Sequence, residues 1–101
     1  MSVATTYTVT VGLYREGQSP ISEDEFNLFL TQEVCPLLRS FSVREELGFF
    51  DGEPEPCKVI TYVSNEFEDG IAIHAIATHY KARFNQQAVM INSFASFPDF
   101  V

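Results

Sequence analysis

The sequence predicts an α+β fold in which two helices cover one face of a four-stranded antiparallel sheet. The predicted elements run strand, helix, strand, strand, helix, strand. The strands are rich in β-branched and aromatic residues, and the helices carry apolar residues at helical spacing. Two right-handed strand–helix–strand crossovers joined in this order give a ferredoxin-like βαββαβ fold. We expect one domain over residues 1–101, with an aromatic C-terminal tail at 93–101.

The first strand and first helix have the clearest local signals. Apolar residues alternate with polar ones along the strand, which predicts one buried face lined by Tyr7, Val9, Val11 and Leu13. Ser22 and Glu25 have the spacing of a capping box, in which each side chain binds the other residue's backbone amide. Pro36 lacks an amide hydrogen and clashes with the preceding turn, so the helix should end near Val34 or Cys35.

The second half of the chain supplies two more strands, a helix and a last strand. The second strand spans 41–49, and the loop 51–56 should stay outside the sheet because its two prolines cannot donate to a ladder. The third strand, at 57–64, is apolar enough to be buried on both faces. The second helix should start between Glu66 and Ile71, since Gly70 weakens its first turn. The fourth strand should start at Ala88.

Composition excludes several classes of protein. The chain has 14 acidic and 6 basic residues and a net charge of −8. This argues against binding to nucleic acid, which requires clustered Lys and Arg. No apolar run approaches the ~20 residues that a membrane helix needs. The N-terminal residues lack a basic and apolar signal segment, and two cysteines are too few for a disulfide scaffold, so we expect a cytoplasmic protein with reduced thiols.

The end of the second helix carries a family resemblance. The run Tyr80-Lys81-Ala82-Arg83-Phe84-Asn85-Gln86 resembles the closing motif of family 3574 of domains of unknown function, Tyr-Lys-x-Arg-Phe-Gly-Gln. Ser22 with Phe26, and the stretch 33–36, are also similar to that family. The sequence departs from the family where Asn85 replaces Gly and where Trp is absent. The resemblance implies the same fold and no particular activity.

Polar residues on the second strand are the first candidates for a binding site. Arg44 and Glu46 share a parity that should point to the open face of the sheet. If Lys58 lies opposite, the three form a cross-strand charge group, which is either surface ion pairing or an anchor for a small polar ligand. Glu45 has the buried parity, so it lies either at a bulge or as a buried carboxylate with a raised pKa.

Other polar residues have structural explanations beside functional ones. Arg83 and Gln86 can bond the free carbonyls at the end of the second helix, or Arg83 can bind a ligand. His74 and His79 differ by about 140° around that helix, so they cannot bind one metal together. The acidic clusters suit helix starts and a solvated loop better than a nucleic-acid mimic. No nucleophile, phosphate-loop or metal motif is present, so we expect no catalytic residue, metal or cofactor.

We therefore expect a non-catalytic module that binds a small molecule or a protein, or associates with itself as a homodimer. The candidate binding residues are Arg44, Glu46, Tyr62 and Arg83. The candidate interface lies on the open sheet face and comprises Ile60, Tyr62, Met90 and Phe94. The aromatic tail could cover this face instead and leave a monomer. The alternative function is a small dimeric enzyme with a pocket on this face, using Arg44, Glu46, Tyr62 or His74.

Overall fold

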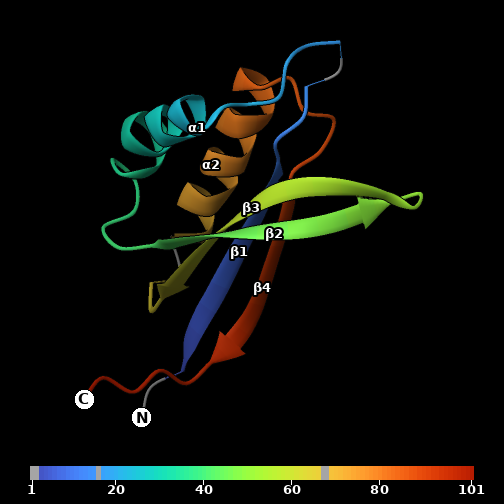
Figure 1. Cartoon of the computed structure of the whole chain (residues 1–101). Coiled ribbons are helices and arrows are strands. Elements are labelled where there is room, and N and C mark those ends of the chain that lie inside the picture. Colours follow the sequence, from blue (N-terminus) through green and yellow to red (C-terminus); the bar gives the residue numbers. More distant parts are fainter. Residues whose placement is uncertain (1–2, 16, 67–68) are drawn as a thin grey trace.

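The computed structural model describes residues 3–15, 17–66 and 69–101, and it has the expected βαββαβ order (Figure 1). The sheet order is β2-β3-β1-β4, and every neighbouring pair is antiparallel. Both helices lie on one face of the sheet, and the β2–β3 hairpin projects beyond the other strands (Figure 1). The ferredoxin-like α+β fold is confirmed. The elements are β1 (Ala4–Gly12), α1 (Glu23–Phe29), the π-helix η1 (Leu30–Val34), β2 (Ser42–Phe50), β3 (Glu53–Ser64), α2 (Asp69–Arg83) and β4 (Met90–Ser96).

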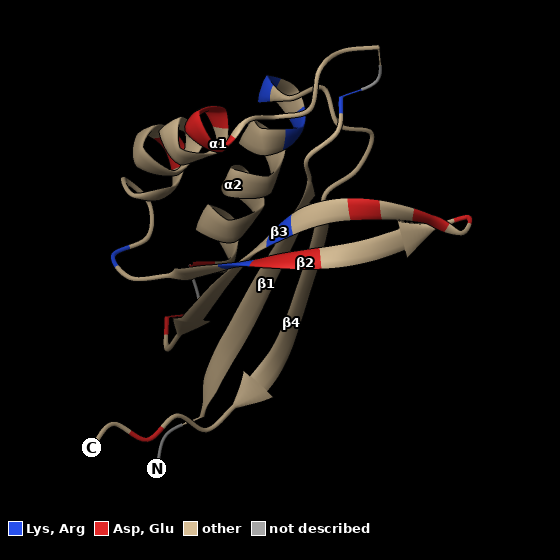
Figure 2. Cartoon of the chain, in the orientation of Figure 1, with Lys and Arg blue, Asp and Glu red and all other residues tan. Residues whose placement is uncertain are grey.

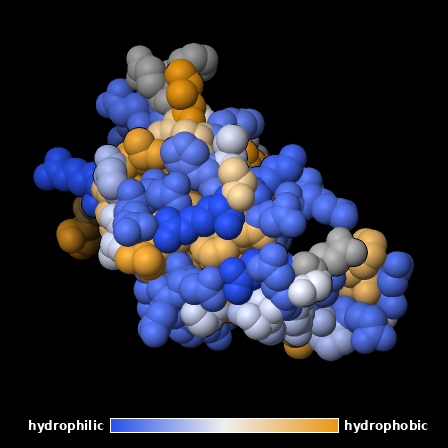
Figure 3. Space-filling model, turned by 90° about the horizontal axis from the view of Figure 1, so that it is seen from above, coloured by the Kyte–Doolittle hydropathy of each residue, from blue (hydrophilic) through white to orange (hydrophobic). Residues whose placement is uncertain are grey.

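The core lies between the sheet and the two helices. Val9, Val11 and Ile60 contribute the strand side, and each is fully buried. The helix side is aromatic: Phe29 packs edge-on against Tyr80, with 5.1 Å between ring centroids, and both side chains are fully buried. Figure 3, a view from above, shows hydrophobic residues on the outer surface as separate patches among hydrophilic ones.

The first helical segment starts and ends for the predicted reasons. Ser22 Oγ accepts from the Glu25 amide at 3.1 Å, and Glu25 Oε1 accepts from the Ser22 amide at 3.2 Å, so the capping box is complete. The helical turns end at Val34, and the last of them are π-helical, with the Cys35 amide donating to the Leu30 carbonyl at 2.8 Å. This wider turn comes directly before Pro36, where an α-helix would meet a steric clash.

The prediction that the prolines exclude residues 51–56 from the sheet is wrong, because β3 begins at Glu53 rather than at residue 57. Asp51 and Gly52 both have positive φ, 49° and 79°, as a two-residue type I′ hairpin turn requires. The flanking pair Phe50–Glu53 is then hydrogen-bonded, and such pairs alternate along the ladder. Pro54 and Pro56 fall at the intervening positions, where β2 requires no amide hydrogen from them.

The predicted placement of Ile60 and Tyr62 on the open face is also wrong. Ile60 pairs with Val9, Tyr62 pairs with Tyr7, and cross-strand partners share a face. Both side chains therefore point toward the helices, and Ile60 is fully buried in the core. The outward residues of β3 are Val59, Thr61 and Val63. The apolar residues of β3 occupy both parities, so hydropathy alone does not fix its orientation.

The remaining boundaries differ modestly from expectation. Helix α2 starts at Asp69, within the expected range, although residues 67–68 of that range lie outside the described residues. Strand β4 starts at Met90 instead of residue 88 and continues to Ser96, so the first part of the predicted tail is strand. No helix among the described residues is long and apolar enough to cross a membrane.

Candidate functional site

The open face of the sheet is built from cross-strand rows of side chains. One row runs Phe94–Thr6–Val63, the next Asn92–Thr8–Thr61–Ser42, and the next Met90–Thr10–Val59–Arg44. The register thus places Met90 and Phe94 on this face, as expected. Threonines occupy most of its centre, so it is smooth and uncharged there. Among the described residues its charges come from β2 and from the hairpin end of β3, where Glu53 and Glu55 share the parity of Val59, and its large exposed apolar side chains come mainly from β4.

The β4 side of this face is apolar and uncovered in the single chain. On β4, Met90 is 60% exposed and Phe94 51%, and Val63 of β3, across Thr6 from Phe94, is 44% exposed. The aromatic tail does not bury itself there, because Phe97 and Phe100 are also exposed. Instead the tail forms one wall of a cleft of about 550 Å³ with residues of β2 and β3, lined by Ser40, Phe41, Ser42, Thr61, Val63, Pro98 and Phe100. This cleft contains no titratable side chain. We call Met90, Phe94, Val63 and Phe100 the apolar patch.

The polar part of the open face is an exposed ion pair. Arg44 Nε donates to Glu46 Oε2 at 3.1 Å, and Arg44 Nη1 donates to Thr61 Oγ1 at 3.2 Å. About half of each charged side chain remains exposed. These two predicted binding residues therefore lie together on the expected face.

Lys58 is not part of that group, contrary to the cross-strand hypothesis. It points to the helix side, is 6% exposed, and binds Glu23 and Glu45 at 2.7 Å each. Burial alone lowers the pKa of Lys58, but the two carboxylates outweigh it and leave this pKa raised. Both ideas about Glu45 are wrong: β2 pairs without a bulge, and the carboxylate is exposed, with its pKa lowered by the hydrogen bond and charge of Lys58.

Tyr62 belongs to a polar network at the start of α2. Its hydroxyl donates to Asp69 Oδ2 at 2.9 Å, and Ser64 Oγ donates to the same oxygen at 2.5 Å. Burial, followed by the hydrogen bond to Asp69, raises the pKa of Tyr62. Tyr7 and Ser64 line an adjacent cleft of about 640 Å³. This cleft is on the helix side of the sheet, so Tyr62 and the Arg44–Glu46 pair do not form one site.

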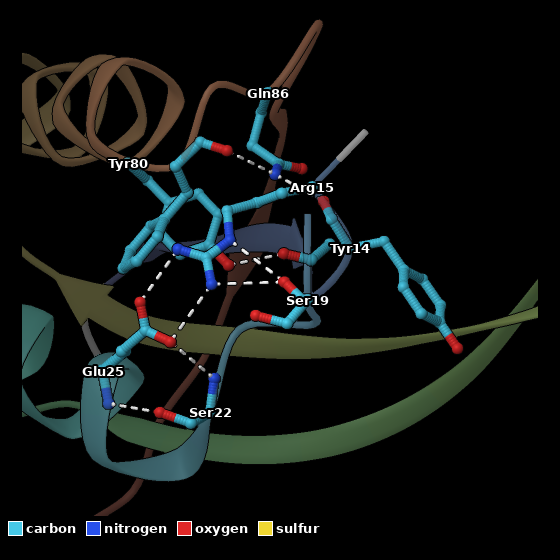
Figure 4. Close-up of polar contacts among 9 residues, drawn as sticks. Tyr14, Arg15, Ser19, Ser22, Glu25, Tyr80 and Gln86 are labelled. Carbon is cyan, nitrogen blue, oxygen red and sulfur yellow. Dashed lines mark hydrogen bonds and ion pairs between the residues drawn. The ribbon is translucent and has the colours of Figure 1, made fainter. Parts of the chain in front are cut away.

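The motif at the end of α2 ties distant parts of the chain together (Figure 4). The Tyr80 hydroxyl donates to the Gly12 carbonyl at 2.5 Å, and Gln86 Nε2 donates to the Tyr14 carbonyl at 2.8 Å, while the Tyr14 ring points away (Figure 4). Beside them Arg15 pairs with Glu25 at 2.9 Å, which joins the same end of β1 to the capping box of α1. These contacts fix the end of β1 against both helices.

Arg83 and His79 have contacts that account for them in the fold. Arg83 Nη1 pairs with Glu33 Oε2 on η1 at 2.7 Å. His79 lies 3.6 Å from the other oxygen of Glu33, and His74 is exposed beside a shallow groove between α2 and β4. In the described ranges, no cluster of three or more His, Cys, Asp or Glu could hold a metal. Arg83 therefore lies away from both Tyr62 and the Arg44–Glu46 pair.

The family described as "Protein of unknown function (DUF3574)" matches residues 6–100. The chain belongs to this family. Among curated proteins, no match to this DUF3574 chain was found. A solved phage SAM lyase in complex with S-methyl-5′-thioadenosine is similar at 16% identity and a TM-score of 0.66, over 97% of this chain and 92% of that one. The de novo designed protein Foldit4 is similar at 16% identity and a TM-score of 0.45, over 96% and 98%. At this identity, the likeness to the lyase shows a shared fold.

Proposed function

We propose that this DUF3574 protein is a non-catalytic binding module that associates with itself as a homodimer through the open face of its sheet. The observation that carries the proposal is the apolar patch, which neither the helices nor the tail covers. Exposed apolar side chains that gather on one face of a protein often mark an interaction site. Phe94 and Val63 flank Thr6 in one row, and the tail residues border the same end of the face.

Charge favours this patch over the other exposed apolar region. The β2–β3 hairpin exposes Leu47, Phe49 and Phe50, but it also carries acidic residues, drawn red in Figure 2, and Glu53 lies opposite Phe50. Two copies, each with a net charge of −8, would repel if these hairpins met. The patch residues and the threonines of β1 and β3 are uncharged. A second copy is therefore the occupant we propose for the open face, with Arg44 and Glu46 as polar groups at its margin.

Light scattering behind a sizing column tests the proposal. We expect the wild-type mass at high concentration to be twice the 11.4 kDa of the chain. Phe94→Glu should shift the mass to one chain, because each copy would bury an unpaired carboxylate in a two-fold interface. Phe49→Glu adds the same charge to the hairpin and should leave the dimer intact. A wild-type mass of one chain at high concentration would refute self-association.

We also propose a reducing, cytoplasmic location. Cys35 and Cys57 are both free thiols, as expected for a protein that is kept reduced. Thiol trapping at cell lysis tests this location. If about half of the Cys35 and Cys57 thiols were found oxidised, the proposal of a reducing compartment would be contradicted.

The second candidate function is enzymatic, and the likeness to the phage SAM lyase over nearly the full length of both chains favours it. The open-face cleft offers no acid or base, whereas the cleft at the start of α2 lies beside Tyr62, Ser64 and Asp69. An enzymatic site would therefore lie at the α2 end rather than on the open face. A rise in melting temperature with S-methyl-5′-thioadenosine, lost in Asp69→Asn, would favour this candidate over the first.

A further inference from the structure

Strand β4 is a free edge of the sheet. It pairs with β1 on one side through seven consecutive residue pairs, from Ala4–Ser96 to Thr10–Met90, without a bulge. In the described part of the chain no strand pairs with its other side. Five of its seven side chains are exposed. An edge of this kind presents unpaired backbone donors and acceptors to any strand that can approach.

The two edges of the sheet differ in their protection against such pairing. The other edge strand, β2, carries Arg44, Glu45 and Glu46 in succession, and charged side chains are a common device against edge-to-edge association. The β4 sequence, Met-Ile-Asn-Ser-Phe-Ala-Ser, has no charge, proline or glycine. Its neighbour β1 is uncharged as well, so the whole β1–β4 side appears tan in Figure 2.

We propose that β4 pairs antiparallel with β4 of a second copy across a two-fold axis at Asn92, which joins the two sheets into one of eight strands. This inference rests on the proposed self-association and places its contact at the β4 edge of the open face, so that the two open faces lie side by side in one sheet and not against each other. Two acidic chains can meet along this edge because β4 itself carries no charge. The apolar patch is continuous with the edge, since Met90 and Phe94 belong to β4 and point to the open face.

The position of the axis follows from the spacing of these two side chains. Met90 and Phe94 lie two residues on either side of Asn92. In a two-fold antiparallel pair centred there, each Met90 lies opposite Phe94 of the other copy, and cross-strand partners on one face have Cβ atoms about 5 Å apart. Sulfur–aromatic contact of this kind is favourable. In the dimer, Met90 and Phe94, which are exposed in the single chain, therefore each contact an apolar side chain of the other copy.

Disulfide trapping tests the pairing directly. At the proposed axis, Asn92 faces its own symmetry mate with Cα atoms about 5 Å apart, within the range that a disulfide spans. Asn92→Cys in a Cys35→Ser, Cys57→Ser background should therefore form a covalent dimer rapidly on mild oxidation. Ser42→Cys is the matched control, because Ser42 lies in the same row and on the same face at the opposite edge. It should form at least tenfold less covalent dimer in the same time.

Amide hydrogen exchange supplies a second readout that needs no substitution. Exchange within residues 90–96 should slow as wild-type concentration rises through the association range, while exchange within 42–50 should not change. A dimeric wild type without the Asn92→Cys cross-link and without protection of 90–96 would overturn the strand pairing and leave the open-face dimer standing. A monomeric wild type would overturn the proposed self-association itself.

Discussion

The two faces of the sheet are built from alternate residues of the same strands, yet they differ in what lies against them. On the helix side, Val9, Val11 and Ile60 are fully buried under aromatic side chains of both helices. On the open side, the same strands present threonines in the centre and exposed Met90 and Phe94 at the β4 edge. Apolar residues therefore serve folding on one face and remain available for association on the other.

Val59 shows that an open face is not the same as an exposed one. It points away from the helices but is only 1% exposed, between Thr10 and Arg44 in its row. Side chains of neighbouring strands screen the centre of a twisted sheet even when no second layer covers it. The outer strands lack a neighbour on one side, so surface available to a partner concentrates there. The exposed apolar side chains of the open face therefore lie mainly on the edge strand β4.

The largest expected effect is the loss of stability when a buried aromatic ring on the helix side is removed, compared with removal of an exposed ring on the open side. Phe29→Ala should lower the free energy of unfolding by about 4 kcal/mol, because it leaves a cavity beside Tyr80 in a fully buried cluster. Phe94→Ala should lower it by about 1 kcal/mol or less, since half of that side chain is already exposed. Urea unfolding at low protein concentration measures both. Equal losses in the free energy of unfolding would mean that Phe94 contributes as much to folding as Phe29 and is not reserved for association.

A second prediction concerns the ion pair between Lys58 and Glu45 on the helix side of the sheet. Lys58 lies buried on the helix side, and its pKa is raised while that of Glu45 is lowered. A lowered carboxyl pKa contributes stability that disappears as the pH falls below 4.5 and through the folded value. A raised lysine pKa contributes stability that disappears as the pH rises above 10.5 and through the folded value. Both contributions are present at neutral pH.

Lys58→Met tests these contributions because it keeps the packing over the Phe26 ring while removing the charge. The stability difference between wild type and variant should be greatest between pH 5 and 10 and should shrink toward both extremes. Urea midpoints at a series of pH values measure it. The Arg15–Glu25 pair is present in both proteins and cancels from the difference. A difference that stays constant from acid to alkaline pH would exclude Lys58 as the source.

Much of the fold was predictable because its signals are local. The capping box at Ser22, the alternation along β1 and the helix end before Pro36 depend on residues within one or two turns. The hairpin turn Asp51-Gly52 is also visible in the sequence, but the two prolines that follow argue against a strand there. A two-residue turn there pairs residue 44 with residue 59. Once Arg44 is assigned outward, Val59, Thr61 and Val63 must point outward too, so this turn could have corrected the placement of Ile60 and Tyr62.

The candidate site was harder to predict because its residues meet only through long-range pairing. Sequence reasoning found Arg44, Glu46, Met90 and Phe94 but missed Val63, whose outward direction depends on its pairing with Thr6. It also grouped Lys58 with Arg44, whereas Lys58 forms its ion pairs on the helix side, with Glu23 of α1 and Glu45 of β2. Parity indicates which residues of one strand share a face. Only the register between strands indicates which residues of different strands do.

The smallest expected effect comes from the ion pair on the open face. Arg44 and Glu46 are both about half exposed, so solvent screens their attraction, in contrast to the buried Lys58. A double-mutant cycle with Arg44→Gln and Glu46→Gln should give a coupling energy of about 0.5 kcal/mol in urea unfolding, and 0.5 M salt should reduce it further. Because the pair lies on β2, far from the β4 edge in sheet order, neither substitution should change the dimer mass. A coupling above about 2 kcal/mol, or loss of the dimer, would show that these charges are covered by a partner and that the interface reaches across the whole open face.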